Sequence, residues 1–231
     1  SYYLGVVGYN ATINDVLLEK VDINSAFYNY NGIRYIPASL KLEDLVGIDL
    51  TNINKHLTKL AGKRNDFIIL DSAQGLGKEA LSILNASNEI IFVTTPFVPM
   101  VNDVIRCRDV ARKFGNKKMS LVLNMVTGSK NELKAETVEK VTNIPVMGEI
   151  YFDRNLTNSL VLRQPILEHK SDSLASIGFM KLASLFSEKE YNAPLKFTIH
   201  KFLKRARNLF SSDVQMTQEL ENVKGEFINP V

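Results

Sequence analysis

The middle of the chain alternates short, nearly continuous apolar runs with segments whose apolar residues recur at helical spacing. This alternation is typical of βα units, in which parallel strands are joined by helices. The predicted strands span residues 32–38, 66–72, 89–95, 119–126 and 146–152. The predicted helices span residues 42–63, 77–87, 101–115, 132–143 and 173–186. Because the strands are apolar on both faces, the pattern predicts an α/β fold with a mostly parallel sheet and helices on both faces.

The pattern changes near the carboxyl terminus, where a polar stretch ends at Pro194. Beyond it, a helical wheel of residues 195–210 separates apolar from basic side chains, although Phe197 interrupts the separation. The apolar stripe consists of Leu195, Ile199, Phe202, Leu203, Ala206, Leu209 and Phe210. The opposite side carries Lys196, Lys201, Lys204, Arg205 and Arg207. The predicted organisation is a domain over 1–187, a linker over 188–194, a basic amphipathic helix over 195–210 and a polar tail over 211–231.

The charge of the chain is concentrated in this helix. Residues 195–210 hold five basic residues and no acidic one, which more than accounts for the net charge of +3. A negatively charged partner is therefore expected to bind there. Such a helix can lie on an anionic membrane surface, or it can pack its apolar stripe against its own domain or a partner. The periodicity by itself leaves both interpretations open.

The composition excludes several classes of protein. With 231 residues, of which 45% are hydrophobic and 23% charged, the chain can bury a core of the size of one α/β domain. It has no apolar run approaching the ~18 residues of a membrane span, and its start does not resemble a signal peptide. Cys107 is the single cysteine, and the three histidines are scattered, so a reducing cytosol is expected and a zinc site is not.

The segment NDFIILDSAQGLGKEAL contains the first candidate chemistry, because the apolar run 67–70 leads into Asp71. Ligands of open parallel sheets bind beyond the carboxyl ends of the strands, and a carboxylate there can coordinate magnesium. The alternative is that Asp71 caps the next helix. Gly75 and Gly77 allow the backbone to approach a phosphate or to take a positive φ, as an ordinary turn would also require. GLGKE is not a phosphate loop, because Glu79 stands where Ser or Thr is needed.

Three motifs occur in a familiar order: DFIILDSAQGLGKEALSILNASNEIIFVTTPFVPMVNDVIRCRDVAR, then LVLNMV, then IPVMGEIYFDRNLTNSLVLRQPI. Together they resemble the MinD/ParA family of deviant phosphate-loop ATPases, and most closely its MinD branch. The resemblance covers nearly everything from Leu4 to Phe186. Each motif alone is weak, but the ordered series is specific.

The resemblance implies roles for individual residues. Asp71 corresponds to the Asp of the second nucleotide motif, which positions magnesium and the attacking water, and Gly75 to the switch glycine whose amide faces the terminal phosphate. Asn124 corresponds to the adenine-contacting Asn, and the loop at Phe152 and Asp153 to the segment that borders the adenine. An amide can both donate to and accept from an adenine edge. Considered without the resemblance, Asn124 could equally be a turn residue at the end of a strand.

The chain departs from the family pattern in several places. Ala73 stands where Pro is usual, Met125 where Arg is common, and Phe97 where Glu is frequent. The family's first strand and its K-G-G-x-G-K-[ST] loop precede the region that YYLGVVG resembles, and this sequence starts at Ser1 without an initiator Met. We therefore expect it to be a fragment that is inactive on its own and that lacks a central strand of the phosphate-loop NTPase-like sheet.

The resemblance also implies a function for the intact protein. It would be a cytoplasmic ATPase that uses ATP and Mg²⁺, forms an ATP-dependent homodimer, responds to a regulatory protein and positions a division septum or another assembly. It would bind the inner face of the cell membrane through Ile199, Phe202, Leu203, Leu209, Phe210, Lys201, Lys204, Arg205 and Arg207. One alternative is a ParA-like ATPase whose basic helix holds DNA, although phosphate binding does not require an apolar stripe. Another is a non-catalytic interaction module without a phosphate loop.

Overall fold

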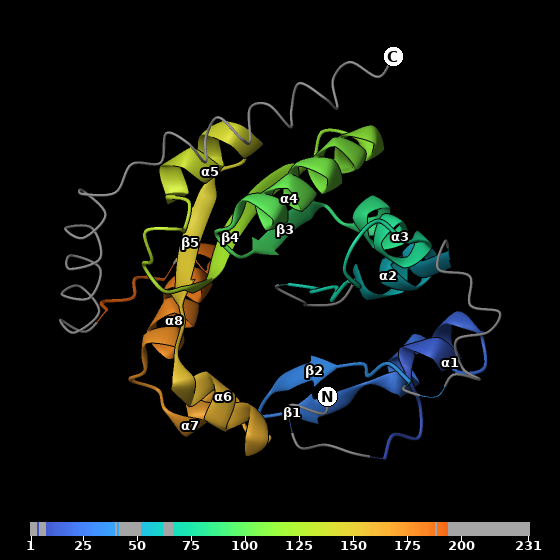
Figure 1. Cartoon of the computed structure of the whole chain (residues 1–231). Helices are drawn as coiled ribbons and strands as arrows, with labels where there is room; N and C mark the ends of the chain where they lie inside the picture. Colours follow the sequence, from blue (N-terminus) through green and yellow to red (C-terminus); the bar gives the residue numbers. More distant parts are fainter. Residues whose placement is uncertain are drawn as a thin grey trace. The chain divides into compact units, whose positions relative to one another are not determined.

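The computed structural model describes residues 4, 8–39, 41, 52–61, 67–187 and 189–193. The chain divides into two compact units, Ser1–Asn88 and Glu89–Val231, each of which is considered separately (Figure 1). The predicted amphipathic helix 195–210 and the tail 211–231 lie outside the described residues. None of the helices within the described ranges is long and apolar enough to cross a lipid bilayer.

The second unit is built on a three-stranded parallel sheet of β3 (Glu89–Thr94), β4 (Lys118–Val126) and β5 (Val146–Tyr151). β4 lies between the other two strands, with Glu89 opposite Lys118 on one side and Leu121 opposite Val146 on the other. These strands match three of the predicted ones to within a residue at each end. The α/β fold class with a parallel sheet is thereby confirmed.

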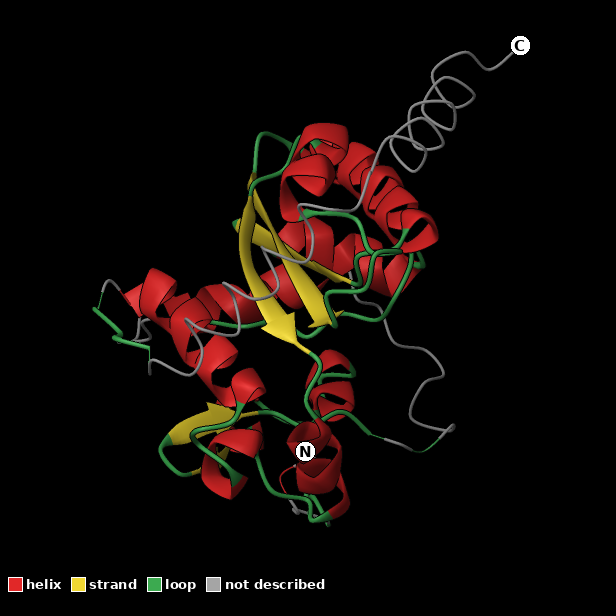
Figure 2. Cartoon of the chain, turned by 60° about the vertical axis from the view of Figure 1, so that its left-hand side comes forward, coloured by secondary structure: helices red, strands yellow, loops and turns green. Residues whose placement is uncertain are grey.

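Helices cover both faces of this sheet (Figure 2). The helices of this unit are α4 (Val98–Ala111) with the short 3-10 helix η5 (Arg112–Phe114), α5 (Ala135–Thr142), α6 (Arg154–Val161), α7 (Ile166–His169) and α8 (Leu174–Ser187), and α4, α5 and α8 are the ones that pack on the sheet. On one face, Val101 of α4 and Val138 of α5 pack with Leu121 and Leu123 of β4. On the other face, Ala175 of α8 packs against strand residues. The alternation of side chains along a strand explains why β4 supplies both cores.

The close contact between α8 and β5 depends on two glycines. A Cβ atom on Gly178 would lie 2.9 Å from Ile150 Cδ1, and one on Gly148 would lie 2.6 Å from Leu182 Cδ2. Real Cβ atoms do not approach other atoms so closely, so a larger residue at either place would require the Leu182 or Ile150 side chain to move. The glycines therefore leave room for these side chains between α8 and β5.

The first unit contains a small helical core and a hairpin. Its elements are α1 (Ile13–Leu17), the 3-10 helix η2 (Ile23–Ala26), β1 (Tyr28–Tyr30), β2 (Ile33–Tyr35), α2 (Ile53–Ala61) and α3 (Lys78–Ala86). β1 and β2 pair antiparallel, and the turn residues Asn31 and Gly32 both have positive φ. This Asn-Gly turn is of the kind that matches strand twist in hairpins. The strand predicted over 32–38 is therefore a short hairpin strand and not part of a parallel sheet.

The strand predicted over 66–72 is not observed, since residues 67–72 form no strand. The side chains of Phe67, Ile68 and Ile69 are 59%, 43% and 89% exposed. A strand exists only where a neighbour accepts and donates its backbone hydrogen bonds, and no described strand pairs with this segment. The apolar run alone was therefore an insufficient basis for the prediction.

Candidate functional site

The residues that are predicted to act at the phosphates of a nucleotide lie in the first unit. Asp71 and Gly75 are exposed in the irregular segment before α3. Gly75 has φ +85°, a conformation that L side chains rarely adopt, which explains a glycine at this position. Within the described ranges, no three His, Cys, Asp or Glu side chains are grouped so that they could hold a metal ion. The magnesium prediction thus depends on Asp71 together with oxygens that a nucleotide would supply.

The residues that are predicted to contact the base lie in the second unit, near the carboxyl ends of β4 and β5. The pairing of β4 with β5 runs from Leu123 opposite Glu149 to Val126 opposite Tyr151. β4 therefore advances three residues while β5 advances two, which is a β-bulge. Side chains three residues apart on a regular strand point to opposite faces of the sheet. Because of the extra residue, Val126 instead lies in the same core as Leu123.

The bulge sets the conformations of Asn124 and Met125. Met125 has φ +56°, which is uncommon for a residue with a side chain, and it is 50% exposed. Asn124 is half-buried, and its side-chain oxygen Oδ1 accepts a hydrogen bond of 2.9 Å from the Met125 backbone N–H. The bulge thus places a half-buried amide and an exposed apolar side chain next to each other near the carboxyl end of β4, where parallel sheets bind ligands.

Phe152 follows directly on the neighbouring strand. Its backbone N–H donates to the carbonyl oxygen of Val126 at 3.0 Å, which holds the start of the loop beside the bulge. Its side chain is 47% exposed, whereas the preceding Tyr151 is buried. Burial raises the pKa of the Tyr151 phenol, and the nearby Glu149 carboxylate adds to this effect. The structure therefore brings Asn124, Met125 and Phe152 together at one edge of the sheet.

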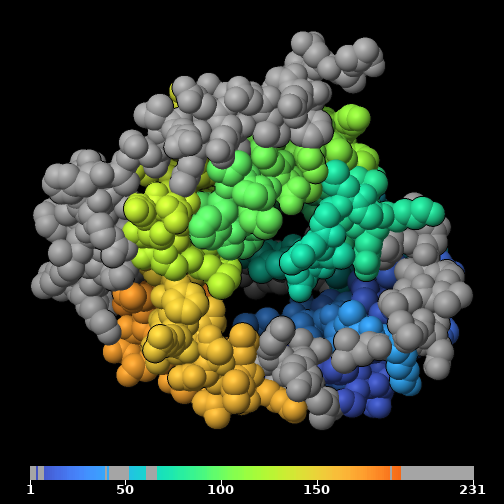
Figure 3. All heavy atoms as spheres, in the orientation of Figure 1, coloured from blue at the N-terminus to red at the C-terminus, as the bar shows by residue number. Residues whose placement is uncertain are grey.

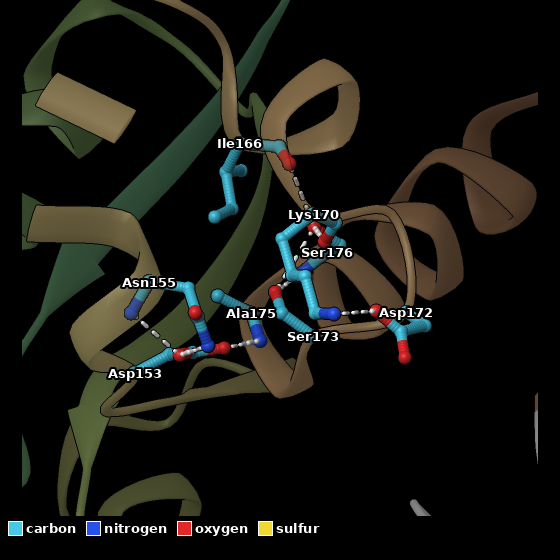
Figure 4. Close-up of polar contacts among 8 residues, drawn as sticks. All are labelled: Asp153, Asn155, Ile166, Lys170, Asp172, Ser173, Ala175 and Ser176. Carbon is cyan, nitrogen blue, oxygen red and sulfur yellow. Dashed lines mark hydrogen bonds and ion pairs between the residues drawn. The ribbon is translucent and has the colours of Figure 1, made fainter. Parts of the chain in front are cut away.

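Asp153 has a structural role that the sequence prediction did not include (Figure 4). Its Oδ1 atom accepts from the backbone N–H of Asn155 in the first turn of α6, and its Oδ2 atom accepts from the N–H of Ala175 in the first turn of α8. Burial opposes ionisation, but these bonds, with others from Asn155 and Ser173 side chains, hold the pKa of the carboxyl below its usual range. A carboxylate that accepts hydrogen bonds from the amino termini of two helices stabilises both helices.

The segment before α8 is also tied by hydroxyl groups. Ser173 caps α8 by accepting from the Ser176 backbone N–H, and the Ser176 hydroxyl donates to the carbonyl oxygens of Ile166 and Lys170 (Figure 4). The space-filling view shows α6 and α7, in yellow and orange, at the surface of the unit (Figure 3). The sequence analysis did not identify these residues, although a serine just before an apolar helical pattern is a helix-start signal.

A buried glutamate fixes the loop after β4. The Glu132 carboxylate accepts hydrogen bonds from the Thr127 N–H at 2.8 Å, the Thr127 hydroxyl at 2.6 Å and the Gly128 N–H at 2.8 Å. Buried carboxylates need such donors. The sequence analysis did not select Glu132, because no local pattern marks a glutamate that folds back on its own loop.

Asp153 and Phe152 therefore differ in what they can offer to a ligand. The Asp153 carboxylate is occupied by two helices, whereas the Phe152 side chain is exposed at the sheet edge. A contact of Asp153, Phe152 or Asn124 with a bound base remains a prediction, as do the roles of Asp71 and Gly75. The predicted membrane-contacting residues lie outside the described residues.

Curated proteins with similar sequences include ATP-binding and cell-division proteins. An uncharacterized ATP-binding protein of Methanocaldococcus jannaschii is 26% identical over 203 residues, which are 87% of this chain and 76% of that protein. The septum site-determining protein MinD of Neisseria meningitidis is 24% identical over 215 residues, covering 87% of this chain and 76% of that protein. No protein-family model matches the chain.

Solved structures with a similar fold include several MinD proteins. MinD of Pyrococcus furiosus, a cell division ATPase, has a TM-score of 0.75 at 24% identity, covering 80% of this chain and 79% of that chain. MinD of Pyrococcus horikoshii, complexed with Mg-ADP, has a TM-score of 0.74 at 25% identity, covering 79% and 76%. The MinC:MinD complex of Aquifex aeolicus has a TM-score of 0.72 at 19% identity, covering 83% and 79%. Together with the sequence relatives, these structures confirm the resemblance to the MinD/ParA family.

Proposed function

We propose, from the premise that the chain resembles MinD-type ATPases over most of its length, that it works as part of an ATPase that binds ATP with Mg²⁺. The observation that carries the proposal is the likeness to the MinD structure that is complexed with Mg-ADP, over 79% of this chain. In this proposal the protein forms an ATP-dependent homodimer and binds the membrane reversibly. Its role is to position cell division or another assembly.

The predicted site residues of each unit have their own proposed role. In the first, Asp71 would hold magnesium through its carboxylate, and Gly75 would present a backbone amide to a phosphate oxygen. In the second, Asn124 and Phe152 lie at the sheet edge where a base would bind. Magnesium would stabilise the negative charge that develops when the terminal phosphate is transferred to water.

The membrane part of the proposal concerns residues 195–210. The segment combines an apolar stripe with five basic residues, and each cation near an anionic leaflet contributes about 1 kcal/mol to binding. In this proposal the protein lies in the cytoplasm and on the inner face of the cell membrane. A regulatory protein that binds the ATPase is proposed because the MinC:MinD complex has a similar ATPase fold.

The membrane proposal can be tested by sedimentation with vesicles that contain anionic lipid. Phe202→Glu should lower the bound fraction about tenfold or more, because it places a charge in the apolar stripe. Phe197→Glu is the matched control, since it makes the same chemical change outside the stripe and should have a much smaller effect. An equal loss in both variants would contradict a stripe that inserts into lipid. Salt-sensitive binding to DNA without any vesicle binding would instead support the ParA-like alternative.

The ATPase proposal is tested on the product of the complete reading frame. We expect Mg²⁺-dependent phosphate release that Asp71→Asn reduces at least a hundredfold. Asp172→Asn is the control, because it makes the same change at an exposed aspartate that has no predicted role at the site. A reading frame without a phosphate loop, whose product neither binds nor hydrolyses ATP, would support the non-catalytic interaction module.

A further inference from the structure

A histidine occupies the centre of the buried side of α2. Ile53, His56 and Leu60 follow one another at helical spacing and are 6%, 4% and 4% exposed. Leu60 packs in the core with Val16 of α1 and Ile23 of η2. An apolar residue would suit the middle of this stripe better, because a buried polar group costs free energy unless it forms hydrogen bonds. The presence of a histidine there therefore requires an explanation.

Neither ring nitrogen of His56 has a hydrogen-bond partner within the ranges that the structure describes. Buried polar side chains in proteins nearly always have one. Burying an unpaired charge costs far more than burying an unbonded nitrogen, so a histidine in this environment is stable as the neutral imidazole. The docked position of α2 therefore favours neutral His56 and disfavours the protonated form.

The charges around His56 act in the same direction. Two lysines of α2 bind the loop between α1 and η2. Lys55 Nζ lies 2.6 Å from Glu19 Oε1, and Lys59 Nζ lies 3.0 Å from Asp22 Oδ2. Each carboxylate is thus already paired with an ammonium group. Burial, and then the two lysines, lower the pKa of His56 more than the two carboxylates raise it.

The other side of α2 connects it to the predicted phosphate site. α2 packs against α3 (Figure 1), and α3 starts at Lys78, just after the exposed segment that holds Asp71 and Gly75. A change in the docking of α2 can therefore reach this segment through α3. The charged groups on α3 and around α1 that do not act on the imidazole are Lys78, Glu79, Asp15 and Lys20.

We propose that α2 is a latch that is docked on the loop between α1 and η2 while His56 is neutral and is released when His56 takes up a proton. Protonation sets three cations, Lys55, His56 and Lys59, against two carboxylates. Release lets water solvate the new charge, and single helices of folded proteins can open in this way without global unfolding. The latch makes the first unit sensitive to acid. It does not depend on the proposed function, because it concerns contacts within this unit alone.

Hydrogen exchange measured by NMR on the full chain, without nucleotide, tests the latch. The readout is the protection factor of the α2 amides, which corrects for the pH dependence of exchange itself. Released α2 binds a proton at the ordinary imidazole pKa of 6.5, whereas docked α2 binds it less readily, so release becomes more favourable below pH 6.5. We expect protection to fall by up to about tenfold between pH 6.5 and 5.5, and by less than about twofold between pH 7.5 and 6.5.

Variants assign this fall to His56. His56→Phe keeps an aromatic ring at the same place without a titrating group, so α2 should stay protected and lose its pH dependence. His56→Leu is a second, smaller replacement that serves the same purpose if phenylalanine overpacks the core. His169→Phe is the matched control, because it makes the same change at a histidine of α7 in the other unit, and it should leave the fall at α2 intact.

Three results would overturn the latch. One is protection of α2 that stays the same between pH 7.5 and 5.5 in the wild type. Another is an equal fall in both His56 variants, which would assign it to carboxylates. The third is an equal fall at β1 and β2, which would show that the whole unit unfolds. A fall at α2 that leaves α3 unchanged would contradict the coupling to the segment with Asp71. Because no nucleotide is present, none of these results can be confused with failure of the proposed function.

Discussion

The two units treat similar residues differently. In the second unit the apolar residues Leu121 and Leu123 are almost fully buried, and the carboxylate of Glu132 has three donors. In the first unit the equally apolar Ile69 is 89% exposed. His56 is 4% exposed, and neither of its ring nitrogens has a hydrogen-bond partner among the residues that the structure describes. An apolar side chain thus stabilises the fold only where a neighbouring element packs against it. A buried polar group does so only where a neighbouring group forms a hydrogen bond with it.

The largest expected effect comes from comparing the apolar run of β4 with the apolar run 67–70. Leu123→Ala should lower the free energy of unfolding of the second unit by about 3 kcal/mol, because it opens a cavity between β4 and its covering helices. Ile69→Ala should change stability by less than about 0.5 kcal/mol, as surface substitutions do. Urea unfolding followed by circular dichroism measures both. A large cost for Ile69→Ala would show that the run 67–70 is buried in solution.

Asp153→Ala should cost about 1–2 kcal/mol, because it removes the cap of α6 and the bond to α8. The pKa of this carboxyl lies below its unfolded value, so its contribution is present above an unfolded pKa of 3.8 and is lost as the pH falls through the folded pKa. Unfolding by urea at pH 7 and pH 3 measures this. If the wild type and Asp153→Asn show the same dependence on pH, the proposed role of the charge is wrong.

The buried His56 predicts how the stability of the first unit depends on pH. Burial, with Lys59 and Lys55 nearby, lowers its pKa, and this effect outweighs the opposing charges of Glu19 and Asp22. The folded state then binds fewer protons than the unfolded state below pH 6.5, so stability falls as the pH decreases from there, by at most about 1.4 kcal/mol per pH unit. His56→Phe should remove this dependence in urea unfolding measured between pH 7.5 and 5. An unchanged pH dependence would show that His56 is hydrated or paired.

The smallest expected effect concerns helix ends in the second unit. Arg163, just after α6, has φ +52° and its N–H donates to the carbonyl oxygen of Leu160, which is a helix stop usually made by glycine. Arg163→Gly should raise the free energy of unfolding by about 0.5–1 kcal/mol. Asn143→Gly, at φ +52° after α5, is the matched control and should gain less, because asparagine tolerates this conformation. Equal gains would contradict the explanation from side-chain strain.

Part of the candidate site could be predicted from the sequence. Asn124 and Phe152 were placed at the ends of β4 and β5, and the structure places them there, because an apolar run that ends in polar residues marks the end of a buried strand. Met125 was noted only as a departure from a family pattern. Its exposure could not be predicted, because the bulge at which it lies arises from the register between two strands.

The sequence by itself determined most elements of the second unit, since β3, β4 and β5 and the helices α4, α5 and α8 follow from apolar periodicity, which is a local property. The helices α6 and α7 were not predicted. It also determined the order of motifs that indicates the family. The tertiary structure decided which apolar runs are strands, as the contrast between Phe67 and Leu121 shows, and it decided that Asp153 joins two helices. These outcomes depend on neighbours that are distant along the chain, because pairing, burial and capping are properties of two segments in contact and not of either one alone.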